Sequence, residues 1–212
     1  MLVVTTPADD LALAPIEAMR AAAGVADDSR DDELAALCLR ISAEIVDACG
    51  VAVGKGAEPT LRKERLTETF SGCHDEVLIL SRRHNIEIVS VTQDGTSITL
   101  DARSLKSEDG LLYRWIDGRK SHWNANEIVV VYDAGFETVP PGLVGVVTDL
   151  ARVRLSEGGV DPLVKSVTVD VEGIDSVKTD RWVGGLGSPQ EAGGLPSGYS
   201  ARLARFMNYS VS

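Results

Sequence analysis

The sequence has few cysteines, and their spacing indicates neither a cross-link nor a metal site. Cys38, Cys49 and Cys73 are the three cysteines in 212 residues. The first two fall on a predicted helix and the third in a predicted loop, which argues against a disulfide framework or a zinc site. We therefore expect free thiols and synthesis in a reducing cytoplasm.

A basic leader and a long apolar run are also missing. The first ten residues, MLVVTTPADD, place no basic residue before their short apolar stretch. No other stretch approaches the roughly 20 apolar residues that a membrane-spanning helix needs. We expect neither a signal peptide nor a membrane span, and a protein that acts in solution.

Positive charge is scarce as well. The chain has 21 Lys and Arg residues against 32 Asp and Glu residues, and its formal net charge is −11. Because phosphate binding depends on clustered Lys and Arg, this balance argues against a protein that grips nucleic acid over its whole surface. It is compatible with a surface past which nucleic acid slides without sticking.

Residues 1–60 predict two N-terminal helices. The first begins at Thr5 or Thr6, has Pro7 in its first turn, and ends near Ala23. Pro15 is expected to make this helix irregular.

The second predicted helix has the stronger pattern. Ser29 and Asp32 have the spacing of a capping box, and Gly50 is a typical helix end. Its apolar residues recur at helical spacing, at Leu34, Leu37, Cys38, Ile41, Ile45 and Cys49.

Residues 61–138 change to the period of strands and predict an inserted antiparallel β region of about five to seven strands. Asp94-Gly95 and Asp117-Gly118 are dipeptides typical of hairpin turns. The predicted strands cover residues 61–70, 77–80, 86–92, 97–100, 111–116 and 127–133.

Three further parts follow. Residues 139–160 predict a third core helix that begins after Pro140-Pro141, and residues 161–183 predict a β-hairpin. Residues 184–212 predict a flexible linker and a C-terminal docking segment. The apolar side chains of that segment could dock onto the chain's own core or onto a partner; they are Tyr199, Leu203, Phe206 and Met207. The predicted fold class is therefore α+β, with a helical core and an inserted β region.

Motifs for catalysis or cofactor binding are incomplete. GVAVGKGAEP, residues 50–59, resembles a phosphate loop, but its glycines are spaced one residue too closely and it follows a helix. His74, His84 and His122 lack the spacing of metal ligands. We expect no catalytic residue, no metal and no cofactor in this chain.

The turn at residues 133–135, DAG, follows a predicted strand and precedes a predicted helix. It contains no Ser, Cys or His, which excludes a nucleophile elbow. We interpret it as a structural joint.

The order of these parts resembles that of head–tail connector proteins, also called adaptor or head-completion proteins, of long-tailed double-stranded DNA bacteriophages and related gene transfer agents. The resemblance covers nearly the whole chain. Its pieces are DACG at the end of the second helix, VSVTQDG, VVVYDAGFETVPPGL, VKSVTVDVEGIDSVKTDRWV and the terminal LPSGYSARLARFMNY. The insert at residues 61–138 departs from the smallest, mostly helical adaptors.

The resemblance implies a non-enzymatic structural protein of the virion neck. Such adaptors form a ring of roughly twelve subunits beneath the portal protein, with closed head-to-tail symmetry. The ring extends the DNA channel and binds the stopper or another tail-side neck protein, while packaged double-stranded DNA passes through it without specific binding. The implied portal-docking residues are Tyr199, Leu203, Phe206 and Met207. Such a protein is made in the host cytoplasm.

Acidic residues near the start of the second helix fit a channel that repels phosphate. They are Asp27, Asp28, Asp31, Asp32 and Glu33. The same residues fit a solvated helix start equally well, because carboxylates there interact favourably with the helix dipole.

Two other functions are compatible with the sequence. One is a different neck or tail protein, a stopper or tail terminator, although those are usually β-dominated and lack a long N-terminal helical pair. The other is a small metal-dependent hydrolase with its site around His74, His84 and His122.

Overall fold

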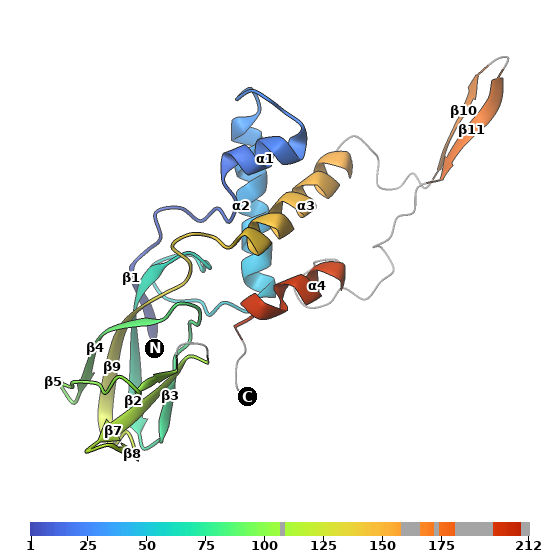
Figure 1. Cartoon of the computed structure of the whole chain (residues 1–212). Coiled ribbons are helices and arrows are strands. Elements are labelled where there is room, and N and C mark those ends of the chain that lie inside the picture. The colour runs from blue at the N-terminus through green and yellow to red at the C-terminus, as the bar shows by residue number, and fades with distance from the viewer. Residues whose placement is uncertain (107–108, 158–165, 172–173, 181–196, 209–212) are drawn as a thin grey trace.

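The structure, a computed structural model, describes residues 1–106, 109–157, 166–171, 174–180 and 197–208. It has an α+β fold in which a helical body and a β body follow each other along an elongated molecule (Figure 1). Each body has its own hydrophobic core. The predicted fold class is confirmed. The helical body contains α1 (Ile16–Ala23), α2 (Asp31–Ala48), α3 (Pro141–Glu157) and α4 (Ser197–Leu203).

The helical body forms because each of its helices has an apolar face. α2 buries Leu34, Cys38, Ile41 and Ile45, which recur at intervals of three or four residues and therefore lie on one side. α3 supplies Leu143, Val146, Val147 and Leu150 to the same core. Fully burying a side chain of this size contributes about 1.5–3 kcal/mol to stability.

The start of α2 differs from the predicted capping box. The hydroxyl of Ser29 donates to Asp27 Oδ1 at 2.6 Å, and Arg30 occupies the cap position without a side-chain hydrogen bond. The prediction of a capping box at Ser29 and Asp32 is therefore wrong. The first turn is instead held by Asp31, whose two carboxylate oxygens accept hydrogen bonds from Arg20 of α1.

The predicted first helix is wrong over its first half. Residues 2–6 form an edge strand, β1 (Leu2–Thr6), and the helix begins only after Pro15. Proline at the helix start is favourable because it lacks an N–H that would have no helical partner. The β body thus includes residues from both sides of the predicted boundary at residue 60.

The larger sheet of the β body is antiparallel, in the order β1-β2-β9-β4-β5. β2 and β9 form its centre, with Leu66 opposite Tyr132. Alternate residues of these strands point into the core, as period-two geometry requires. The bounds are β2 (Glu64–Cys73), β9 (Ala125–Ala134), β4 (Glu87–Gln93) and β5 (Thr96–Ser97).

Shorter strands cover the other side of this core. They are β3 (Val77–Ile79), β6 (Leu105–Lys106), β7 (Leu111–Ile116) and β8 (Arg119–Ser121). Trp123 is fully buried among them and donates its indole N–H to the Leu112 carbonyl at 3.0 Å. The predicted turns are confirmed: both residues of Asp94-Gly95 and of Asp117-Gly118 have positive φ, which suits a two-residue hairpin turn.

The later elements follow the predicted order. α3 begins at Pro141, and β10 (Ser166–Val171) pairs with β11 (Ile174–Asp180) as an antiparallel hairpin. The predicted helix stop at Gly158 and most of the predicted linker, residues 184–196, lie outside the described residues. α4 begins at Ser197, inside the range predicted as linker.

β9 and α3 meet at a joint formed by residues 133–136 and residues 61–63. The Gly135 N–H donates to the His84 carbonyl at 2.8 Å, and the Phe136 N–H donates to the Leu61 carbonyl at 2.8 Å. Gly135 has φ +106°, and a Cβ there would lie 2.2 Å from the Arg62 carbonyl oxygen. The joint therefore requires glycine for both its backbone conformation and its close contact.

The substitution Gly135→Ala is expected to lower the free energy of unfolding by about 2 kcal/mol or more, because the added methyl group must displace backbone atoms. Gly118→Ala is the matched control: φ is +76° there, but no atom lies within 4 Å of the added Cβ. It should cost only the left-handed penalty, about 1–2 kcal/mol. Urea denaturation of both variants measures the difference. Equal losses would contradict the steric argument.

Candidate functional site at the joint

The C-terminal segment, residues 197–208, docks onto the helical body of its own chain. Leu203 is 1% exposed and Phe206 is 4% exposed, and both belong to the core formed by α2 and α3. Tyr199 and Met207 are half-buried. Of the two docking alternatives, the structure shows the chain's own core. Leu203 and Phe206 are therefore buried against this chain's own core in this conformation, and the portal-docking role stays a prediction.

Asn208 joins this segment to both bodies. Its N–H donates to the Cys49 carbonyl at 2.7 Å, where α2 ends. Its side-chain amide donates to the Ser81 carbonyl at 2.6 Å, and its Oδ1 accepts the Arg83 N–H at 3.1 Å. One residue thus connects the helical body with the loop between β3 and β4. The sequence contained no signal for this role.

Three rings pack at the same place. His84 stacks on Phe136 with 5.2 Å between ring centroids, and Phe206 meets Phe136 edge-on at 5.9 Å. His84 Nε2 lies 2.9 Å from the Phe206 carbonyl, to which it can donate a hydrogen bond. His84 therefore has a structural role at the joint.

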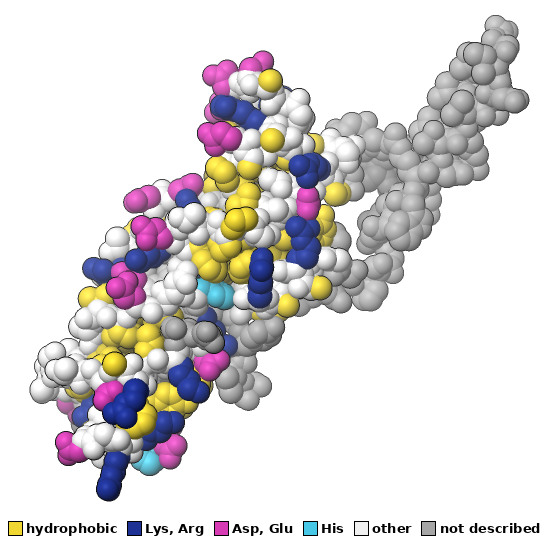
Figure 2. Space-filling model, viewed as in Figure 1, with side chains coloured by type: hydrophobic (Ala, Val, Ile, Leu, Met, Phe, Trp, Pro, Cys, Tyr) yellow, Lys and Arg dark blue, Asp and Glu magenta, His cyan; other side chains and the backbone are white. Residues whose placement is uncertain are grey.

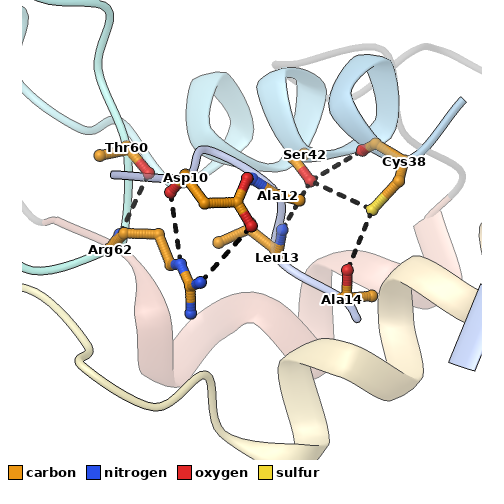
Figure 3. A network of polar contacts seen from close by, with 8 residues as sticks. All are labelled: Asp10, Ala12, Leu13, Ala14, Cys38, Ser42, Thr60 and Arg62. Carbon is orange, nitrogen blue, oxygen red and sulfur yellow. Dashed lines mark hydrogen bonds and ion pairs between the residues drawn. The ribbon is translucent and has the colours of Figure 1, made fainter. Parts of the chain in front are cut away.

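Residues 10–14 make a second connection between the two bodies (Figure 3). Ser42 of α2 accepts the Leu13 N–H at 3.0 Å, and the Cys38 thiol donates to the Ala14 carbonyl at 3.5 Å. At the other end, Arg62 Nε donates to the Asp10 carbonyl at 3.4 Å. The segment between β1 and α1 is thereby attached to α2 and to Arg62, which lies just before β2.

A buried polar network in the β body joins Glu68 of β2, Tyr132 of β9 and Ser81. Glu68 Oε2 accepts hydrogen bonds from the Tyr132 hydroxyl at 2.9 Å and the Ser81 N–H at 3.0 Å, and Oε1 accepts the Ser81 hydroxyl. Burial raises the pKa of Tyr132, and the neighbouring Glu68 raises it further. Tyr132 therefore stays protonated and acts as a donor inside the β body.

The acidic residues near the start of α2 lie in two different environments. Asp27, Asp31 and Glu33 are held by Ser29, Arg20 and Arg30 respectively. Asp28 and Asp32 are exposed, and neither forms an ion pair with a described residue. Three of the five candidates thus have a local role in the helix start.

The three histidines do not come together. His74 contacts Asn124 at 2.8 Å, His84 lies at the joint, and His122 lies 3.5 Å from Glu76. Within the described ranges there is no group of three or more His, Cys, Asp and Glu residues that could hold a metal ion. The geometry gives no support to a site built from these histidines.

The stretch that resembles a phosphate loop runs beside an edge strand. The Lys55 N–H donates to the Leu2 carbonyl at 3.0 Å, and the Lys55 carbonyl accepts the Val4 N–H at 2.8 Å. The backbone groups of Lys55 are therefore used by β1.

Comparison with protein-family models and with curated proteins gives no match to this chain. Among the helices that the structure describes, none is long and apolar enough to cross a membrane.

Phe206→Ala is expected to lower the free energy of unfolding by about 3–5 kcal/mol, because it leaves a cavity between the helical body and the joint. Met207→Ala, one residue away and half-buried, is the matched control and should cost about 1 kcal/mol or less. Chemical denaturation measures both. Similar small losses would show that the segment does not dock as described.

Stability should depend on pH through His84. Burial lowers the pKa of His84, against a smaller raising effect of the Phe206 carbonyl. The unfolded chain therefore binds a proton more readily below about pH 6.5. The contribution of neutral His84 is complete above that pH and is lost as the pH falls through it toward the lowered folded-state pKa.

We therefore expect wild type to lose more stability between about pH 7.5 and about pH 5.5 than His84→Asn, by up to about 1.4 kcal/mol per unit of pKa difference. Asparagine suits the positive φ of residue 84. His122→Asn is the control, since the His122 side chain is 62% exposed. Urea midpoints at both pH values give the comparison. An unchanged pH slope in His84→Asn would refute the assignment.

Proposed function

We propose that this protein is a structural subunit of the neck of a long-tailed phage or gene transfer agent. In this proposal it forms a ring of roughly twelve copies beneath the portal, extends the DNA channel and joins head to tail. The observation that carries the proposal is the order of parts: helices, an inserted β body, a third helix, a hairpin and a docked terminal segment. This is the order for which the sequence resembles the head–tail connectors.

The long helix α2 favours an adaptor over a stopper or tail terminator. It spans 18 residues and supplies much of the helical core. Stoppers and terminators are usually β-dominated, so a substantial helical body is the feature that separates the two classes. The β body would then project from the ring toward solvent or toward the next ring.

The burial of Leu203 and Phe206 changes which residues of the C-terminal segment could contact the portal. Leu203 and Phe206 hold the segment to its own subunit. Tyr199 and Met207 are half-buried and keep an accessible edge that a portal protein could contact. The proposed portal contact therefore uses the outer face of the docked segment.

The negative charge of the subunit suits a channel for DNA. The formal net charge of −11 disfavours sticking of phosphate, so packaged DNA would pass without specific binding. Asp28 and Asp32 are exposed and form no ion pair with a described residue, so their charges are available to repel a passing polyanion. The tail-side partner would be a stopper or related neck protein.

Purified particles should contain this chain at a copy number close to that of the portal protein. Quantitative mass spectrometry with isotope-labelled peptides from both proteins measures the ratio, and the major capsid protein serves as the internal control. A ratio near one supports a ring matched to the portal. Absence of the chain from intact, tailed particles would refute the proposal.

A further inference from the structure

β10 and β11 form a two-stranded sheet that pairs with no other described strand. Figure 1 shows this hairpin lying apart from both bodies, beyond the end of α3. An isolated two-stranded hairpin is at best marginally stable in water, and it needs a further strand or a packing surface. Because no third strand joins it among the described residues, both outer edges of the hairpin keep unpaired backbone groups.

β4 has the complementary feature, an edge that is open over residues 87–90. On one side β4 pairs with β9 from Glu87 to Gln93, whereas on the other side β5 pairs with it only at Thr92 and Gln93. The Ile98 N–H adds one hydrogen bond to the Val91 carbonyl. Apart from the pairing with β9, residues 87–90 form no backbone hydrogen bond with a described residue.

A groove of about 330 Å³ lies beside this open edge. One wall is residues 88–91 of β4, and the other comes from residues 98–105, which follow the short strand β5. Apolar side chains form much of both walls, among them Ile88, Val89, Val91, Ile98, Leu100 and Leu105. Figure 2 shows hydrophobic side chains at the surface of the β body. The groove therefore joins unused backbone groups to an apolar lining.

An extended strand fits a groove of this kind, because its backbone pairs with the open edge while its alternate side chains meet the apolar walls. β4, EIVSVTQ, contains neither Lys nor Pro, the residues that commonly protect an edge from pairing. In the sequence, β10 reads SVTVDV, with valine at every second position. β10 therefore has the alternation that suits this groove.

The length of the chain favours the groove of another copy over the groove of the same subunit. α3 begins at the joint, and its 17 residues carry the chain about 25 Å away from the β body. Residues 158–165 separate α3 from β10, and a segment of that length spans at most about 30 Å. Nearly all of that span is needed to return to the joint, which leaves little for reaching residues 88–91 of β4.

We propose that β10 of one subunit adds to the open edge of β4 in a second copy of this chain. This inference rests on the proposed ring and names its lateral contact: the hairpin of one subunit in the β4 groove of the next. Because the two surfaces differ, each subunit donates one strand and accepts another, which is a head-to-tail contact. Such contacts close into a ring when the rotation allows it.

Cross-linking between two single-cysteine chains tests this contact. One full-length chain carries Ser90→Cys, at an exposed position of the β4 edge, and the other carries Thr168→Cys in β10. The native cysteines are buried, and burial raises the pKa of each, to about 12 for Cys49. A short bismaleimide should therefore react with the introduced thiols. The expected product of the mixture is a linked pair with one copy of each chain, several-fold more abundant than any product from either chain alone.

A chain that carries both cysteines tests whether the contact continues beyond a pair. It should give a ladder of three or more linked copies, in the concentrated free chain and in purified particles, because a head-to-tail contact does not stop at a dimer.

The groove is tested by a charge in its wall. Val89→Lys in the double-cysteine chain should remove most of the ladder, since it replaces an exposed apolar side chain beside the open edge. Ile116→Lys is the matched control: Ile116 is 46% exposed against 48% for Val89, and it lies on β7, outside the groove. It should leave the ladder intact. Circular dichroism checks that each variant is folded.

Four outcomes would overturn the inference. Efficient linking of the Ser90→Cys chain to itself would indicate a two-fold contact between β4 edges. An internal link in the double-cysteine chain, with no product from the mixture, would place β10 in the groove of its own subunit. A ladder that survives Val89→Lys would exclude the groove. No linked product from the free chain or from particles would exclude the contact.

The proposed neck function is tested separately by the copy number in particles. If the contact fails but the copy number matches the portal, the neck function still stands without this lateral contact. A ladder from a chain that intact, tailed particles lack would support the contact and refute the neck function.

Discussion

The close approach of Gly135 to the backbone of residues 61–63 is the constraint on which both bodies depend. The last strand of the β body must turn into the third helix at a point where another part of the main chain already lies in contact. A side chain there would separate the two segments. With glycine, the sheet and the helical core are connected through backbone hydrogen bonds, and the loop at His84 and the terminal segment can close over the same place.

Two buried glutamates on one face of β2, Glu68 and Glu64, differ in the number of hydrogen-bond donors around them. Glu68 is surrounded by donors, so its burial costs little and orders Tyr132 and Ser81. Glu64 has a single poorly oriented cation, and both its oxygens and part of Arg82 are left without hydrogen bonds. An arrangement of this kind is a weak source of stability.

The sequence predicted those elements whose signal is local. The stripe of α2, the two Asp-Gly turns and the start of α3 at the prolines follow from periodicity and turn chemistry, and they are present in the structure. The strand at residues 2–6 was missed because its identity depends on pairing with residues 65–68, far along the chain. The predicted cap at Ser29 is wrong because the Ser29 hydroxyl donates to Asp27 instead. The site at the joint could not be predicted, because Asn208, His84 and Cys49 are brought together only by the tertiary fold.

The position of the terminal segment also bears on how the chain is completed during synthesis. Most of the residues of both cores lie within residues 1–157, yet the contacts of Phe206 and Asn208 are supplied by residues that leave the ribosome much later. Until then, the ring of Phe136 and the end of α2 lack a cover. A chain that is cut short would keep an apolar surface open at the centre of the molecule, where quality-control proteases and chaperones recognise incomplete folds. Subunits with a finished C-terminal segment would be the ones that persist.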